Sequence, residues 1–272
     1  MPSRISKEGA LNLSGLVSVR QWMARSCIKP FTSHSLTNRA PSHCRPLSRF
    51  VKSAQERAKS PSFSPGLSCR ALHSSVMSMA AQRKGKVEVL LVGSSIFGMW
   101  EKAAEQLAPL SVANVAINGS FTTDHFGLIG PLVLPRRPSI VVYYCGSNDI
   151  SYGATAEQVA HNFVEYSSRL RLALPDVRII YLGVLKCADK YGKFEIIDTT
   201  NAIVKEFCDA TAHHYFVDIN SQLLHPNGET AKDELFEDDN LHLLPTTYTA
   251  VVVPALKPLL TKLCEDVSQT SA

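Results

Sequence analysis

No run of about 18 apolar residues occurs in this chain of 272 residues, so the sequence predicts no transmembrane helix. The longest apolar runs, Val89–Val92 and Ile140–Cys145, have the length of buried strands. Seven cysteines include no C-x-x-C pair, which disfavours a zinc site or a disulfide scaffold and favours free thiols in a reducing compartment. The chain also lacks G-x-G-x-x-G, and no lysine follows the G-x-x-x-x-G spacing of Gly93 to Gly98, which argues against nucleotide binding.

Charge is distributed unevenly, although the net charge is only +4. Residues 1–86 hold 15 of the 28 Lys and Arg residues and two acidic residues, Glu8 and Glu56, so this stretch carries +13 and the remainder −9. Such an asymmetry predicts two unlike segments. We expect a basic leader over residues 1–84 and a folded domain over 85–272, which is long enough to bury a sizeable core.

The leader contains 17 serines, nine arginines and no aspartate. An Arg-rich, Ser-rich and acid-poor start is typical of an organelle transit peptide, so we expect plastid or mitochondrial targeting. The alternative is a disordered tail, or translation that begins at Met77 or Met79, in which case the protein is cytoplasmic. Binding to nucleic acid is not expected, because the few aromatic residues of the leader are too scattered to form a stacking platform.

Five strands separated by helices are predicted downstream. Consecutive residues of each strand are β-branched or apolar, so both faces of the strand are apolar. This is typical of a parallel sheet that helices cover on both sides. Helices are predicted after the capping box that begins at Thr155, over Thr199–Cys208, and over Thr246–Leu263, where Pro254 and Pro258 kink or split the helix. The fold class is therefore a three-layer, doubly wound α/β sandwich. The expected strands are Lys86–Val92, Val112–Ala116, Ser139–Cys145, Arg178–Leu182 and Tyr215–Asp218.

Small polar clusters follow these strands, at the sheet edge where ligands bind in such folds. A hydroxyl, a glycine N–H, an amide side chain and an Asp/His pair meet there, which are the parts that acyl transfer needs. The clusters are Gly93-Ser94-Ser95, Asn118-Gly119-Ser120, Gly146-Ser147-Asn148-Asp149 and Asp239-Asn240-Leu241-His242.

These four blocks, in this order, resemble the SGNH hydrolases, also called GDSL-type esterases or lipases. The resemblance covers roughly residues 87–263 and implies an SGNH, flavodoxin-like fold and a serine esterase that needs no metal or organic cofactor. Ser95 matches the nucleophile, and its N–H, the N–H of Gly119 and the side-chain amide of Asn148 match the oxyanion hole. His242 matches the general base and Asp239 the residue that orients it. The implied partner is a small-molecule ester, and the oligomeric state is left open.

Several alternatives remain at this point. Ser95 could simply cap the next helix, Gly119 could be only a turn glycine, and Asn148 could form a local turn. The first block reads Gly-Ser-Ser where the family usually has Gly-Asp-Ser, so a non-catalytic binding module that kept the fold is the competing function. The substrate could be a short acyl ester, an acetylated sugar, a lysophospholipid or a thioester. The loop Leu185–Phe194 either lines the substrate pocket or is a solvated loop.

Overall fold

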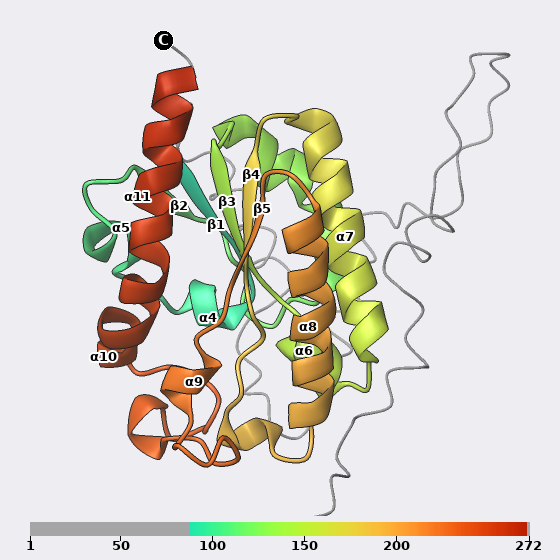
Figure 1. The fold of residues 1–272 in the computed structure, drawn as a ribbon, viewed down its shortest axis with the longest axis vertical. Coiled ribbons are helices and arrows are strands. Elements are labelled where there is room, and N and C mark those ends of the chain that lie inside the picture. The colour runs from blue at the N-terminus through green and yellow to red at the C-terminus, as the bar shows by residue number, and fades with distance from the viewer. Residues whose placement is uncertain (1–87, 271–272) are drawn as a thin grey trace, which may run out of the picture. The chain divides into compact units, whose positions relative to one another are not determined.

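A single parallel sheet of five strands lies at the centre of the computed structural model, which describes residues 88–270 (Figure 1). The strand order is β2-β1-β3-β4-β5, so the chain begins in the sheet interior, moves to one edge and then crosses to the other. Every neighbouring pair in this sheet is parallel, which confirms the predicted doubly wound architecture. The strands are β1 (Val89–Gly93), β2 (Val112–Asn114), β3 (Ile140–Tyr144), β4 (Arg178–Leu182) and β5 (His214–Val217).

Helices cover both faces of the sheet. In Figure 1, α7 and α8 lie on one side of the strands, and α11 and α5 lie on the other, which gives the three layers. The predicted capping box begins α7: the Thr155 hydroxyl accepts from the Gln158 N–H, and the Gln158 side chain accepts from the Thr155 N–H. The helices are α4 (Ser95–Gly98), α5 (Ala103–Gln106), α6 (Ser147–Ser151), α7 (Ala156–Ala173), α8 (Phe194–Ala210), α9 (Asn220–Leu223), α10 (Pro245–Thr247) and α11 (Val253–Thr270).

The carboxyl-terminal helix is split, as its prolines predicted. A short turn, α10, leads into a π-helical segment, η6 (Tyr248–Val252), and then into α11, which contains Pro258. Proline has no N–H to donate to the preceding turn, so it interrupts the regular ladder. The remaining short turns are the 3-10 helices η1 (Thr122–Gly127), η3 (Leu134–Arg136), η4 (Ala188–Lys190) and η5 (Asp233–Leu235) and the π-helix η2 (Ile129–Val133).

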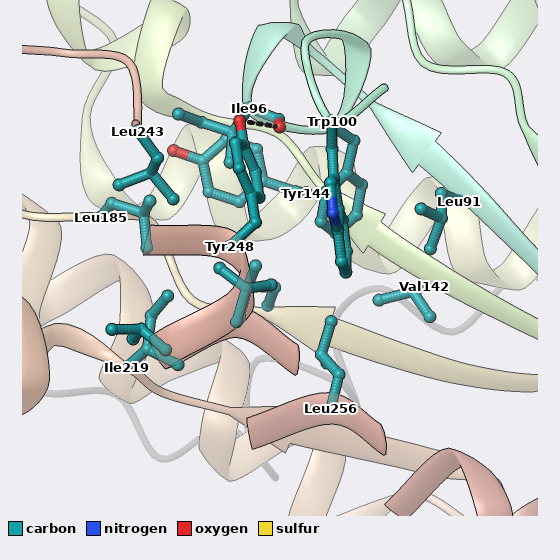
Figure 2. Packing of buried hydrophobic residues seen from close by; sticks show 14 of the residues in the cluster. Leu91, Ile96, Trp100, Val142, Tyr144, Leu185, Ile219, Leu243, Tyr248 and Leu256 are labelled. Atoms are coloured by element: carbon teal, nitrogen blue, oxygen red, sulfur yellow. Dashed lines mark hydrogen bonds between the residues drawn. The ribbon is translucent and has the colours of Figure 1, made fainter. Parts of the chain in front are cut away.

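The core between the sheet and the carboxyl-terminal layer joins distant parts of the chain. Figure 2 shows side chains from β1, α4, β3 and the carboxyl-terminal segment packed together, among them Leu91, Trp100, Val142 and Leu256. All four are buried. Burial of apolar area on this scale is the main stabilising contribution to such a layer.

The carboxyl ends of the strands lead into the short helices α4, α6 and α9, which lie near one another in Figure 1. This edge carries the polar clusters predicted from the sequence. The predicted leader, residues 1–84, lies outside the described residues. Within residues 88–270 no helix has both the length and the hydropathy needed to cross a bilayer, and the four cysteines there, Cys145, Cys187, Cys208 and Cys264, are free thiols.

Candidate active site

A sharp turn between β1 and α4 holds Ser95. A Cβ at Gly93 would lie 2.0 Å from the carbonyl oxygen of Tyr144, so only glycine fits at the end of the strand. The Ser94 N–H donates to the same carbonyl at 3.0 Å. The Ser94 side chain is buried and forms no capping hydrogen bond, so backbone contacts shape a turn where the family usually has a carboxylate. Ser95 is the first residue of α4 and does not occupy the cap position, so the alternative that it merely caps the helix is wrong.

A continuous hydrogen-bonded chain joins Ser95, His242 and Asp239. The His242 Nε2 atom lies 2.8 Å from the Ser95 hydroxyl oxygen, across 147 positions of sequence. On the other side of the ring, Nδ1 lies 2.5 Å from a carboxylate oxygen of Asp239. An ionised carboxylate can only accept, so Nδ1 carries the proton and Nε2 accepts from the serine hydroxyl.

Asp239 shapes the loop as well as the ring. One of its oxygens accepts from the backbone N–H groups of Leu241 and His242, at 3.0 and 2.9 Å, while the other faces the ring. Burial alone would raise the pKa of Asp239, but the hydrogen bonds from His242 and Leu241 outweigh it and lower that pKa. The neighbouring Asp238 is exposed and makes no such contact among the described residues.

Packing behind the loop holds His242 against Ser95. Tyr248, six residues after His242, donates its hydroxyl to the carbonyl of Ile96 at 2.7 Å, next to Ser95 (Figure 2). Its ring stacks on Trp100, with centroids 5.3 Å apart. The segment that follows the histidine is thus fixed to the helix that begins with the serine.

The loop that carries Gly119 is anchored to the same strand end. The Ile117 N–H and the Ser120 hydroxyl both donate to the Gly93 carbonyl, at 2.8 and 3.2 Å. Gly119 itself adopts φ +75°, which favours glycine. The Asn148 side chain donates to the Ser120 carbonyl at 2.9 Å, so its contact reaches across 28 residues and is not a local turn.

Asp149 connects α6, which also carries Asn148, to the loop that follows Gly119. Its position in the sequence does not reveal this contact. Its carboxylate accepts from the Thr122 N–H at 3.1 Å and from the Thr122 hydroxyl at 2.6 Å. Burial raises the pKa of Asp149, and the hydrogen bonds from Thr122 offset part of that rise. Asp149 lies in the first turn of α6, and from there it also holds the loop that carries Gly119.

The loop Leu185–Phe194 is tied down beside the site. The buried Lys190 ammonium donates to the Ser151 hydroxyl of α6 at 2.6 Å. The Asp189 N–H donates to the Asn240 carbonyl in the histidine loop at 3.1 Å. The loop therefore connects α6 with the histidine loop, and the description of it as merely solvated is wrong.

Three other features of the described residues complete the picture: a cysteine near the site, the question of a metal, and a separate hollow. Cys145 lies close by, with its sulfur 3.6 Å from the Ser120 carbonyl, but burial raises the pKa of its thiol and disfavours the nucleophilic thiolate. Within the described residues, no three His, Cys, Asp or Glu side chains group so as to hold a metal ion. A hollow of about 520 Å³ lies at the amino end of β5, lined by His213 and His214 among others, away from the Ser95 edge.

The chain is similar to known proteins in sequence and in fold. Residues 92–250 match the GDSL-like Lipase/Acylhydrolase family. The platelet-activating factor acetylhydrolase IB subunit alpha2 of Gallus gallus is 26% identical over 185 residues, which cover 66% of this chain and 78% of that protein. The alpha1 subunit from Rattus norvegicus is 26% identical over 196 residues, covering 70% and 83%. The crystal structure of a GDSL-like lipase from Bacteroides thetaiotaomicron has the same fold, with a TM-score of 0.57 at 16% identity over 70% of this chain and 97% of that one.

Proposed function

Since the chain belongs to the GDSL-like lipase/acylhydrolase family and is a serine ester hydrolase, we propose that it cleaves carboxylic esters through an acyl-enzyme on Ser95. The observation that carries this proposal is the hydrogen-bonded chain from Asp239 through His242 to Ser95. A serine hydroxyl is a weak nucleophile unless a base lies within hydrogen-bond reach, and here the base is itself oriented by a carboxylate.

In the proposed reaction His242 Nε2 removes the hydroxyl proton as Ser95 Oγ bonds to the ester carbonyl carbon. The carbonyl π pair moves to oxygen, and the tetrahedral intermediate expels the alcohol, which takes the proton from His242. Water then gives a proton to His242 as its oxygen bonds to the acyl carbon. The second tetrahedral intermediate breaks its bond to Ser95 Oγ, which takes the proton back from His242, and the carboxylic acid leaves. Asp239 stays ionised throughout and stabilises the imidazolium that forms twice.

The oxyanion would be met by the N–H groups of Ser95 and Gly119 and by the Asn148 amide. Among the described residues, the N–H groups of Ser95 and Gly119 make no backbone hydrogen bond. The Asn148 amide has two N–H donors and uses one of them on the Ser120 carbonyl. Each donor of this kind is typically worth ~10²–10³ in rate.

We propose a short acyl group as the substrate's acid part. The support is that the similar proteins from chicken and rat carry the word acetylhydrolase in their names. A panel of p-nitrophenyl esters from acetate to palmitate tests this point. A preference for acetate or butyrate is expected, and a preference for palmitate would contradict it.

A fluorophosphonate probe tests the nucleophile. Wild type should be labelled and Ser95→Ala should not be. The matched control is Ser94→Ala, because Ser94 is the adjacent serine, is buried and uses no side-chain hydrogen bond to cap the helix. It should keep labelling and turnover close to wild type. Folded wild-type protein that fails to label and hydrolyses no ester would favour the non-catalytic binding module.

A further inference from the structure

Behind the Gly119 loop, three buried polar side chains form a chain of their own. Ser120 Oγ lies 2.9 Å from His125 Nε2, and His125 Nδ1 lies 2.9 Å from the hydroxyl of Tyr143 on β3. His125 is 1% exposed, Ser120 3% and Tyr143 not at all. Within residues 88–270, the hydrogen-bond partners of these three side chains do not include Ser95 or His242, so the proposed reaction leaves this histidine without a role.

The direction of each hydrogen bond follows from its end point. The Gly93 carbonyl can only accept, so Ser120 donates its single hydroxyl proton there. Ser120 Oγ must then accept from His125, which places the ring proton on Nε2, and the bare Nδ1 accepts from Tyr143. The opposite assignment, in which Ser120 donates to Nε2, leaves the 3.2 Å contact between Ser120 Oγ and the Gly93 carbonyl without a proton.

His125 is neutral in this arrangement. Desolvation by burial lowers its pKa from 6.5 to about 4. Above that pH the ring keeps one proton and one lone pair, and both are used. The ring also meets Tyr143 edge-on, with centroids 5.2 Å apart, so its plane is fixed by packing as well.

Ser120 links this chain to both proposed loop donors. It directly follows Gly119, and its N–H closes the turn by donating to the carbonyl oxygen of Ile117 at 3.2 Å. Its carbonyl holds one N–H of the Asn148 amide, which fixes the direction of the other N–H. A change in the position of Ser120 would therefore move both donors together.

We propose that His125 is a positioning residue, a neutral ring in a single tautomer that holds Ser120 and, through Ser120, the oxyanion hole. The inference rests on the proposed function of Gly119 and Asn148. A shift of an ångström or less in such donors is enough to weaken transition-state stabilisation while leaving substrate binding intact. His125 should therefore affect kcat much more than KM.

The test compares His125→Phe with a matched variant, His214→Phe. His214 is also buried, bonds a serine, Ser167, at 2.7 Å, and meets the ring of Phe207 edge-on, but it lies at the amino end of β5. Both variants replace a buried histidine by an aromatic ring, so both should lower the melting temperature. Only His125→Phe should lower kcat, by about 10- to 100-fold with KM changed less than about threefold, a part of what loss of a whole donor costs.

Three further variants separate positioning from simple destabilisation. His125→Gln, which keeps a donor and an acceptor, should recover most of the lost kcat. Ser120→Ala removes one hydroxyl and tests the same link if His125→Phe does not fold; it should lower kcat in the same way. In an Asn148→Ala background, His125→Phe should lower kcat less than it does in wild type, because one of the two donors that it positions is gone.

The proposal is overturned if His125→Phe and Ser120→Ala both keep wild-type kcat, if His214→Phe lowers kcat as much as His125→Phe, or if the loss persists in full beside Asn148→Ala. These outcomes are distinct from failure of the proposed function. If the proposed function were wrong, Ser95→Ala would keep its turnover. If Ser95→Ala loses turnover while His125→Phe keeps full activity, only the positioning role of His125 is refuted.

Discussion

Replacing Asp239 by asparagine should invert the tautomer of His242. The backbone N–H groups of Leu241 and His242 both point at one oxygen of this side chain, at 3.0 and 2.9 Å. In Asp239→Asn they select the amide oxygen for that position, which turns the NH₂ group toward Nδ1. A donor facing Nδ1 forces the ring proton onto Nε2, where the ring cannot accept the proton of Ser95.

The size of the effect follows from two contributions. Turning the amide over to restore the productive tautomer loses two backbone hydrogen bonds, about 1–3 kcal/mol in all. Loss of the carboxylate also removes its attraction for the imidazolium, ~1–4 kcal/mol at about 4 Å for effective dielectric constants from 80 to 20. The Asp239 side chain is 49% exposed, so solvent screening favours the lower half of that range. A total of about 2–5 kcal/mol corresponds to a fall in kcat of roughly 30- to 5,000-fold.

The assay is steady-state hydrolysis of a p-nitrophenyl ester by Asp239→Asn, with Asp238→Asn as the control. Asp238 is the adjacent carboxylate, is exposed and does not contact the ring, so its variant should keep wild-type kcat. Circular dichroism checks that both variants are folded. The reasoning is refuted if Asp239→Asn stays within about threefold of wild type, or if Asp238→Asn loses as much.

Stability against pH gives an independent check of the same residue. The pKa of Asp239 is lowered from 3.8 by its hydrogen bonds, which outweigh burial. Its ionised form therefore stabilises the folded state fully above about pH 3.8, and this contribution is lost as pH falls through the lowered pKa. Wild type should be more stable than Asp239→Asn at neutral pH, and the difference should shrink only below pH 3.8; an unchanged difference down to pH 2 would contradict this.

Two other perturbations follow from the contacts around the site, and a third follows from the composition of residues 1–84. Asp149→Ala leaves the N–H and hydroxyl of Thr122 without their acceptor and should lower the free energy of unfolding by about 1–3 kcal/mol. The melting temperature should fall by several degrees and kcat should fall with it; unchanged values of both would contradict the link between α6 and the Gly119 loop. Tyr248→Phe keeps the ring stack but removes the bond to Ile96, and should cost ~0.5–1.5 kcal/mol with a loss of turnover of less than about tenfold, measured by thermal unfolding and ester hydrolysis. Deleting residues 1–84 should leave kcat unchanged, and sequencing of the mature amino terminus tests cleavage, because a mature protein that begins at Met1 would defeat the transit-peptide proposal.

The sheet was predictable because its strands are apolar through both faces. Arg178–Leu182 has the predicted bounds, and Ile140–Tyr144 is shorter than predicted by one residue at each end. β2 ends at Asn114, two residues early. There the asparagine side chain donates to the Phe97 carbonyl and accepts from the Ala116 N–H, a contact with no signature in the local pattern.

The ends of the helices and the surroundings of the histidines were harder to predict from the sequence. The helix expected over Thr199–Cys208 runs from Phe194 to Ala210, because Phe194 and Ile197 add apolar turns that the capping signals did not mark. His214 begins β5, and nothing in the surrounding sequence pattern marks it as buried, yet it is. Its ring packs edge-on against Phe207 and bonds Ser167, which lies in α7, 47 residues earlier.

The same distinction applies inside the site. Ser95, Asn148 and His242 could be proposed as site residues because each lies in a short block that resembles a block of the SGNH hydrolases. Ser120, His125 and Asp149 lie within or beside those blocks, yet their partners come from other strands and loops, so no spacing could show what they hold. Catalytic groups need particular side chains, whereas the groups that position them need only complementary donors and acceptors, which many residue pairs supply. Positioning residues therefore have to be read from hydrogen-bond directions in the folded chain, and this is why the tautomer of His125 says more about its role than its place in the sequence does.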